Sequence, residues 1–238
     1  MNAGVARIRS VIFEKMPMCF SATASLVAGG ALSVTGGLTM MKAKTKSELP
    51  FASIPLLFGI QQAIEGVVWL SFGAPLLHTI ATYAYMMFSH VLWPIFIPVS
   101  IILLETDQFR KKILWVFSLV GLAVGVYLAY YIITDVVTVQ VIHQSLRYYS
   151  INAYPILIIM FYLMATCGSC FFSSHRIINL FGLVLSLSFI IAVWFFFETF
   201  FSVWCFLAAI LSVLVYWYFK REERNKKKRG LSFAKATE

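Results

Sequence analysis

The chain has 238 residues, of which 61% are hydrophobic and 12% charged, and its mean hydropathy is +0.85. Soluble domains carry about 25% charged residues, so this composition excludes a water-soluble globular protein. The length instead accommodates about seven membrane spans of roughly 20 residues with short connections. Most of the net charge of +9 lies in the connections and the C-terminal tail, which indicates the anionic inner leaflet of a membrane, and not nucleic acid, as its partner.

Residues 1–17 contain an apolar patch too short for a span, so we interpret them as a peripheral lead-in, with Met18 as a possible start of the cellular protein. Seven apolar runs follow, and each is expected to be a transmembrane helix. The predicted fold class is therefore an all-α integral membrane bundle over residues 18–219, followed by a polybasic tail over residues 220–238. The runs cover about 20–41, 51–72, 78–104, 112–133, 150–172, 177–197 and 199–219.

The distribution of Lys and Arg predicts the orientation, because cytoplasmic connections carry an excess of positive charge. Seven basic residues lie in the connections after the first, third and fifth runs, and eight lie in the tail. The opposite side carries Arg147 and the three basic residues of the lead-in. The N-terminus is therefore predicted outside and the C-terminus in the cytoplasm of a cell-membrane protein. The seven are Lys42, Lys44, Lys46, Arg110, Lys111, Lys112 and Arg176; those in the lead-in are Arg7, Arg9 and Lys15.

The second run contains Glu65 together with Gln61 and Gln62 in its middle. An ionisable side chain at that depth costs at least a few kcal/mol unless it faces a partner or water. In a helix the three polar residues share a face with Phe58, Trp69 and Phe72, because they are three or four residues apart. This face is expected to look into the protein.

The third run contains His90 and, shortly after it, Trp93, Pro94 and Pro98. Pro94 has no N–H group to donate to the carbonyl of His90, so a kink is expected beside the imidazole. A rise of about 1.5 Å per residue places His90 and Glu65 in the outer half of the membrane, where their side chains could meet.

Several short motifs recur together along the chain. Met18 to Ala22 read MCFSA, Glu48 to Pro50 read ELP, and Ser202 to Phe206 read SVWCF. With these motifs the chain resembles a family of uncharacterised, mainly bacterial, multi-pass membrane proteins that begin with MCFSA. The resemblance covers nearly all of the chain after Met18 and implies a shared fold, but it brings no activity. It continues through Gln61, Gln62, Glu65, Gly66, Trp69, Trp93, Pro94, Pro98, His143, Arg147, Tyr148, Ser173, Ser174, His175 and Arg176.

We expect an outward-facing polar cavity that binds an unknown small or lipid-like ligand. Its centre would be Glu65 with His90, and the first and last runs would contribute residues near their outer ends. A polar outer connection would lie above it. The candidate ligand-binding residues are Glu65, Gln61, Gln62, His90, Trp69, Trp93, Cys19, Ser21, His143, Arg147 and Trp204.

Three functions remain open at this point. The first is ligand binding or transport through the cavity. The second is an intramembrane enzyme that acts on lipid with Glu65 and His90 as acid and base. The third is a structural or assembly subunit whose buried polar side chains only join helices. His90, Glu65, His143 and Cys19 could converge on a zinc ion, but no HExxH, HxxxH or paired CxxC spacing is present, so neither a metal nor a cofactor is expected.

Overall fold

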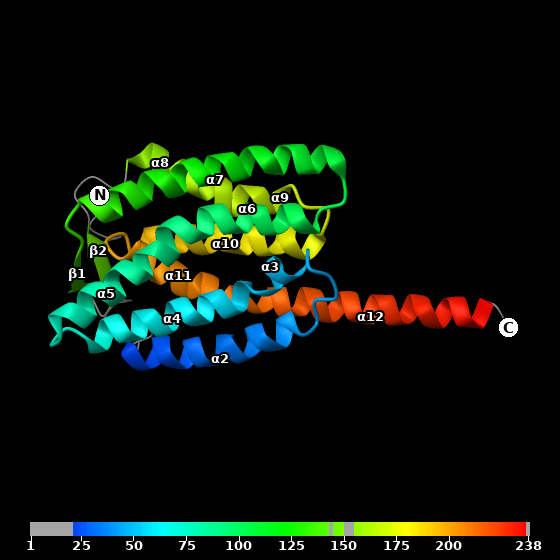
Figure 1. Ribbon diagram of the computed structural model, residues 1–238, viewed down its shortest axis with the longest axis horizontal. Helices are drawn as coiled ribbons and strands as arrows, with labels where there is room; N and C mark the ends of the chain where they lie inside the picture. The colour runs from blue at the N-terminus through cyan, green and yellow to red at the C-terminus, as the bar shows by residue number, and fades with distance from the viewer. Residues whose placement is uncertain (1–20, 143–144, 150–154, 237–238) are drawn as a thin grey trace, which may run out of the picture.

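A computed structural model describes residues 21–142, 145–149 and 155–236. Its helices run side by side along the long axis of the molecule (Figure 1). The described part is mainly helical and contains one two-stranded sheet. In chain order the elements are α2 Ala22–Met40, α3 Leu49–Ala52, α4 Ile54–Leu70, α5 Pro75–Met86, η1 Met87–Leu92, α6 Trp93–Leu104, α7 Gln108–Thr134, β1 Thr138–Ile142, β2 Ser145–Tyr149, α8 Ile156–Leu163, η2 Met164–Gly168, α9 Ser169–Phe171, α10 Arg176–Phe195, α11 Phe200–Leu211 and α12 Val213–Ala236.

Five of the described helices are long and apolar enough to cross a membrane. The expectation of a helical membrane protein is confirmed at this level. Two shorter apolar helices, Ile54–Leu70 and Ile156–Phe171, correspond to the second and fifth apolar runs of the sequence. The five long helices are Ala22–Met40, Pro75–Leu104, Gln108–Thr134, Arg176–Phe195 and Phe200–Arg224.

The predicted disturbance beside Pro94 takes the form of a π-helical turn, η1, between α5 and α6. A π-helix pairs residues five apart, so it shifts the hydrogen-bond register just before a residue that has no N–H group. The carbonyl of Ser89 in this turn accepts a hydrogen bond of 2.5 Å from the Tyr162 hydroxyl of α8. The turn therefore connects the third apolar run to the fifth.

A β-hairpin lies at one end of the bundle, in the segment expected to be a polar outer connection. Its strands β1 and β2 pair antiparallel, with Thr138 opposite Tyr149 and Ile142 opposite Ser145. Strand β2 is largely buried, with Leu146 and Tyr148 packed against α5 and α11 residues. The bundle is therefore not purely α-helical, and one strand belongs to its interior.

Glycines allow two pairs of helices to approach closely. A Cβ added to Gly29 or Gly36 of α2 would collide with the α4 backbone, and one added to Gly121 of α7 would overlap the carbonyl oxygen of Pro94. Close packing of this kind replaces the hydrophobic driving force that is missing between helices in lipid. Gly30 and Gly37, the residues that follow Gly29 and Gly36 in the chain, face open space.

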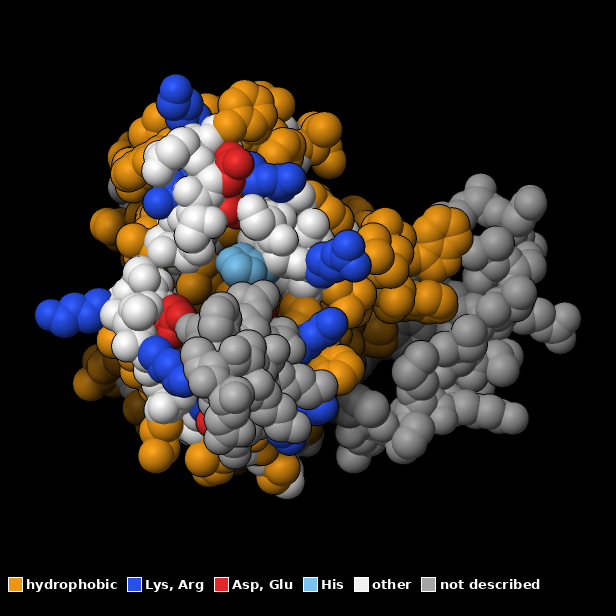
Figure 2. Space-filling model, turned by 90° about the vertical axis from the view of Figure 1, so that its right-hand side faces the viewer, with side chains coloured by type: hydrophobic (Ala, Val, Ile, Leu, Met, Phe, Trp, Pro, Cys, Tyr) orange, Lys and Arg blue, Asp and Glu red, His pale blue; other side chains and the backbone are white. Residues whose placement is uncertain are grey.

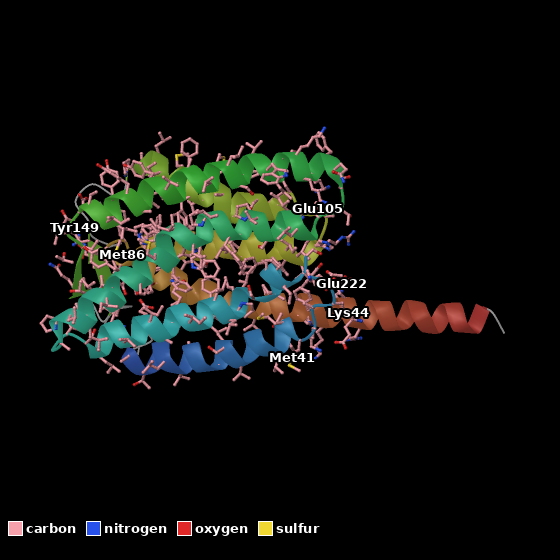
Figure 3. The ribbon with its side chains drawn as sticks, viewed as in Figure 1. Met41, Lys44, Met86, Glu105, Tyr149 and Glu222 are labelled. Atoms are coloured by element: carbon pink, nitrogen blue, oxygen red, sulfur yellow. The ribbon has the colours of Figure 1, made fainter. Side chains whose placement is uncertain are left out.

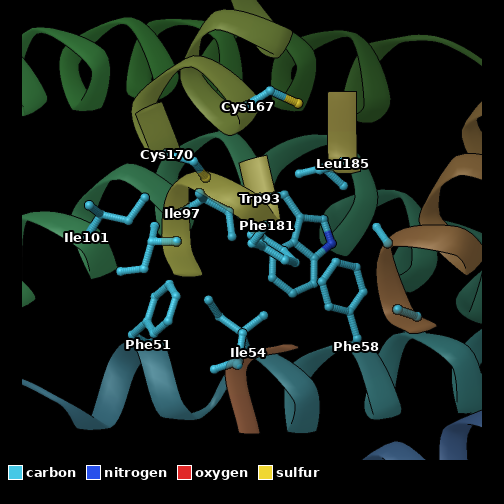
Figure 4. Close-up of a cluster of buried hydrophobic side chains, with 14 of the residues drawn as sticks. Phe51, Ile54, Phe58, Trp93, Ile97, Ile101, Cys167, Cys170, Phe181 and Leu185 are labelled. Carbon is cyan, nitrogen blue, oxygen red and sulfur yellow. The ribbon is translucent and has the colours of Figure 1, made fainter. Parts of the chain in front are cut away.

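The main hydrophobic core lies where α3, α4, α6 and α10 meet the η2–α9 segment (Figure 4). Phe58 and Trp93 stack at its centre with ring centroids 3.9 Å apart. The indole N–H of Trp93 donates a 2.6 Å hydrogen bond to Oε1 of Gln61, so the core borders a polar region on α4.

The two ends of the bundle differ in chemistry. Lys44, Glu105 and Glu222 lie at the end from which α12 projects, whereas Tyr149 of the hairpin lies at the other end (Figure 3). Lys and Arg side chains gather around the α12 end (Figure 2). The basic connections of the sequence therefore come together at one end of the bundle.

Candidate functional site

Glu65 lies inside the protein on α4, with 2% of its surface exposed. The pattern prediction that its helix face looks inward is confirmed for Phe58, Gln61, Gln62 and Glu65, all of which are buried. It is wrong for Phe72, which lies beyond the end of α4 and is exposed. The carboxylate oxygen Oε1 accepts a 2.5 Å hydrogen bond from the hydroxyl of Ser202 on α11. This bond joins the second apolar run to the last one.

Two tyrosines flank the carboxylate from other elements. Tyr85 of α5 and Tyr148 of β2 stack with ring centroids 4.5 Å apart and an interplanar angle of 11°. Both phenols are within electrostatic reach of Glu65. Neither hydroxyl makes a well-formed hydrogen bond, although both oxygen atoms are buried and the Tyr85 phenol lies close to Glu65 and Cys205. The hairpin therefore places a phenol beside a carboxylate that comes from a helix about 80 residues earlier in the chain.

The two glutamines add further unused hydrogen-bonding capacity. Gln61 accepts the Trp93 bond through Oε1, but its Nε2 has no partner, and neither side-chain atom of Gln62 has one. Thr82 of α5 and Ser145 of β2 also have buried hydroxyls without a hydrogen bond. A buried polar group without a partner costs about 1–3 kcal/mol. The residues in contact with one another around the carboxylate are here called the Glu65 cluster: Gln61, Gln62, Glu65, Tyr85, Tyr148, Ser202 and Cys205.

A small apolar cavity of about 20 Å³ borders the Glu65 cluster on its core side. Its wall includes Trp93, Tyr162, Trp204 and Cys205. A volume of this size holds about one water molecule. The Trp204 indole N–H donates to the carbonyl of Leu185 at 3.2 Å, so the candidate residue Trp204 is part of the cavity wall and helix packing.

His90 does not pair with Glu65, contrary to the expected meeting of the two side chains. Its Nδ1 lies 2.6 Å from the Ser89 hydroxyl, and its ring packs on Phe201 at a centroid distance of 4.3 Å. Within the described residues the carboxylate and the imidazole share neither a hydrogen bond nor an ion pair. The two side chains contact neighbouring residues near the start of α11: the His90 ring packs on Phe201, and the Glu65 carboxylate accepts the Ser202 hydrogen bond.

The remaining candidate residues have various positions. Ser21 caps the N-terminus of α2 by accepting a 3.2 Å hydrogen bond from the N–H of Ala24. Trp69 is half-buried and packs beside Val68 at the hairpin end. Arg147 lies over the ring of Tyr149, with its guanidinium carbon 5.3 Å from the centroid. Cys19, His143 and the lead-in of residues 1–17 lie outside the described residues.

The described residues contain no group of three or more His, Cys, Asp or Glu side chains close enough to hold a metal ion. The polar groups of the Glu65 cluster are one carboxylate, several hydroxyls, two side-chain amides and one thiol. Such groups orient a small polar or positively charged molecule by hydrogen bonds and charge.

Tyr85 is not identified as a member of the cluster in the sequence analysis, which names Tyr148 and Ser202 only as parts of the motifs that carry the resemblance. A signal for Tyr85 is its spacing: Thr82, Tyr85 and Ser89 are three or four residues apart and share one face of the third run. Polar residues on one face of a membrane helix indicate a partner inside the bundle.

A second buried carboxylate, Glu105, lies at the opposite end, just after α6 (Figure 3). Its Oε1 accepts hydrogen bonds from the N–H groups of Thr106 and Asp107 at 2.9 and 3.1 Å and from the Ser174 hydroxyl at 2.6 Å. Its Oε2 accepts the N–H of Ser174 at 2.7 Å. Burial raises the pKa of Glu105, but these hydrogen bonds outweigh burial and bring the pKa below the ordinary value. The carboxylate fastens the α6–α7 connection to the connection before α10.

The fold is that of a helical protein with several helices suited to a membrane, and its most polar interior region is built around one carboxylate. The chain belongs to a family of unknown function (DUF6629), which matches residues 18–230. No curated protein and no solved structure matches the chain.

Proposed function

We propose that the chain is a seven-span protein of the cell membrane, with its N-terminus outside and its tail in the cytoplasm, that binds a small polar ligand in the Glu65 cluster. The seven spans are the five long helices and the two shorter apolar helices. α3 and Ser53 lead directly into α4, so the second span extends from Leu49 to Leu70. That length, about 33 Å at 1.5 Å per residue, is enough to cross a bilayer core of about 30 Å.

The observation that carries the proposal is the unused hydrogen-bonding capacity around one buried carboxylate. Gln61, Gln62, Tyr85 and Tyr148 contribute five buried atoms without a well-formed hydrogen bond, although Gln62 and Tyr85 lie close to the carboxylate. Core packing alone does not account for so many, because most buried polar groups in proteins have a partner. A ligand with hydrogen-bonding groups would satisfy several of them at once. Because the bordering cavity holds only about one water molecule, the side chains of the cluster must move apart to admit such a ligand. The carboxylate and the two phenol rings favour a ligand that carries a positive charge, such as a protonated amine.

A structural role is the second candidate, and the Ser202–Glu65 bond supports it because this bond fastens α11 to α4. Interhelical hydrogen bonds of this kind contribute about 0.6–2 kcal/mol. A lipid-acting enzyme that uses Glu65 and His90 as a pair receives less support, since the two side chains have separate partners. Only ligand binding predicts that the loss of a single hydroxyl lowers the affinity for a ligand.

The discriminating variant is Tyr148→Phe, which removes a hydroxyl without a partner and keeps the ring stack. If the cluster only fastens helices, this change leaves stability unchanged or raises it. If the cluster binds a ligand, it lowers ligand affinity. Glu65→Gln keeps the shape and can still accept the Ser202 bond, but it removes the negative charge. Glu198→Gln, at an exposed position, is the matched control.

The measurement is thermal unfolding of the purified full chain in detergent, with ethanolamine, choline and putrescine as cationic probes and glycerol as a neutral one. We expect at least one amine to stabilise the natural chain and the Glu198→Gln control equally. A ligand at 100 times its Kd stabilises by about 2.7 kcal/mol. We expect this stabilisation to disappear in Glu65→Gln and to weaken in Tyr148→Phe. Equal stabilisation of all variants, or none of the natural chain, contradicts the proposal.

A further inference from the structure

An apolar groove of about 460 Å³ lies on the outside of the bundle between α10 and the α11–α12 junction, and its mainly apolar walls differ from the polar Glu65 cluster. Its walls include Leu180 and Val184 of α10 and Ile210, Val213, Trp217 and Lys220 from the two later helices. α11 ends at Leu211 and α12 begins at Val213, with Ser212 between them donating a 2.6 Å hydrogen bond to the carbonyl of Ala209.

The groove has the length of one leaflet. From Ile210 to Lys220 the helices rise about 15 Å, which is half of the roughly 30 Å hydrocarbon core of a bilayer. Ile210, Val213 and Trp217 are all about half exposed along this path. One end of the groove is therefore at headgroup depth when the other is near the midplane.

A basic residue, Lys220, ends one wall of the groove, and Arg176 lies one helical turn beyond Leu180 of the other wall. Arg176, Leu180 and Val184 are spaced four residues apart on α10, so they share one face, and Arg176 is the residue of that face nearest the basic end of the bundle. Lys220 ends the other wall, with Nζ 5.9 Å from the centre of the Tyr216 ring. Within the described residues, neither Arg176 nor Lys220 forms an ion pair.

The Nζ atom of a third basic residue, Lys42, lies 5.9 Å from the centre of the same Tyr216 ring. This ammonium group forms an ion pair with Glu223, with Nζ and Oε2 2.8 Å apart. The Glu223 hydrogen bond is the main reason that the pKa of Lys42 is raised. Among the described residues, Arg176 and Lys220 are thus cations beside the end of the groove that pair with no carboxylate. Lys and Arg side chains also surround this end of the bundle (Figure 2).

We propose that this groove binds an anionic phospholipid of the cytoplasmic leaflet, with one acyl chain along Ile210, Val213 and Val184 and the phosphate between Arg176 and Lys220. Shape and charge agree on this occupant: an apolar channel one leaflet long ends in two exposed positive charges. Arginine and lysine at membrane surfaces attract anionic headgroups. The site is independent of the ligand proposed for the Glu65 cluster.

The test compares phosphatidylglycerol with phosphatidylcholine of the same acyl chains, added to the delipidated full chain in detergent and counted as bound lipid by native mass spectrometry. We expect the natural chain to prefer phosphatidylglycerol. In the double variant Arg176→Gln, Lys220→Gln, the ratio of bound phosphatidylglycerol to bound phosphatidylcholine should fall by about 30-fold. Each cation near a membrane surface increases the affinity for an anionic lipid roughly fivefold. The control Lys46→Gln, Lys112→Gln removes the same charge from exposed positions at the same end and should keep the preference.

A second variant tests the groove without changing charge. Val213→Trp fills the channel at a position that is 45% exposed, so the fold should tolerate it, and we expect fewer bound molecules of either lipid. The proposal is overturned if the natural chain binds both lipids equally or if Val213→Trp binds as many lipid molecules as the natural chain. It is also overturned if the Lys46→Gln, Lys112→Gln control loses as much of the preference for phosphatidylglycerol as the Arg176→Gln, Lys220→Gln variant.

Discussion

Glu105 shows how one side chain can join two connections of the bundle. Four hydrogen bonds reach its carboxylate, two of them from Ser174 in a connection about 70 residues later. We expect Glu105→Gln to lower the free energy of unfolding at pH 7 by about 1–3 kcal/mol, because the amide group of Gln turns a donor toward groups that already donate. Thermal unfolding in detergent measures this change.

The pH dependence of the same variant follows from the lowered pKa. A carboxyl whose pKa is lower in the folded state than its ordinary value of 4.5 stabilises the fold above that value. The stabilisation is lost as the pH falls through the folded pKa. The difference between the natural chain and Glu105→Gln should therefore shrink below about pH 4.5. A difference that is constant from pH 7 to pH 3.5, or one equal to that of the exposed Glu198→Gln, argues against this role.

At the scale of single residues, the sequence could predict that Glu65 is buried, because a charge in an apolar run is too costly in lipid. It could not predict the partner. Ser202 is one of many small polar residues in apolar runs, and helix periodicity does not say which runs are neighbours. Glu105 was missed because a carboxylate between two runs is usually solvated. His90 was assigned to the wrong neighbour, since equal depth in the membrane does not fix the side of a helix.

The contact between α2 and α4 offers the sharpest test at the scale of elements. A Cβ on Gly36 would overlap the backbone and side chain of Leu56, whereas a Cβ on Gly37 meets nothing within 4 Å. We expect Gly36→Ala to destabilise the protein by about 1–3 kcal/mol through overpacking. Gly37→Ala should be neutral or stabilise by about 0.5–1 kcal/mol, because alanine loses less backbone entropy in a helix.

The two glycines are neighbours in one helix, so each variant is the control of the other. Their melting temperatures in the same detergent should move in opposite directions or differ clearly. Equal melting temperatures would mean that α2 and α4 are not as close as the structure has them.

The elements themselves could be predicted to different degrees. The helices follow the apolar runs because the backbone must satisfy its own hydrogen bonds in lipid. The position of the kink followed from Pro94, but its form as a π-turn depends on contacts such as the Tyr162–Ser89 bond. The hairpin was missed although Thr138–Ile142 is rich in β-branched residues, because its strands have only five residues each. Burial of β2 comes from tertiary packing that no local pattern records.

At the scale of the whole molecule, the chemical difference between the two ends is the strongest argument for an orientation. Basic connections lie at the α12 end and the hairpin at the other (Figures 1 and 2). Seven spans require the two ends to face opposite sides of the membrane, whereas five spans would bring some of these connections to the same side. The distinction does not depend on any ligand.

Cysteine labelling on intact cells tests the topology directly. Lys44 and Lys112 are exposed at the basic end, and Gln140 of β1 is exposed at the hairpin end. Cys167, Cys170 and Cys205 are buried, so their background labelling should be low, and Cys19→Ser removes the fourth thiol. With a membrane-impermeant maleimide, we expect Gln140→Cys to react on intact cells. Lys44→Cys and Lys112→Cys should react only after the membrane is opened, because positive connections stay in the cytoplasm.

The pattern of reactions separates the two parts of the topology. If all three reactivities are exchanged, seven spans remain and the orientation is wrong. If Lys44→Cys and Gln140→Cys react from the same side, the segments between them do not cross the membrane as proposed. In the proposed topology the second and fifth spans are the two shorter apolar helices, so comparing Lys44→Cys with Gly73→Cys tests the second one alone. These two positions flank α4, and the helix that carries Glu65 crosses the membrane only if they react from opposite sides.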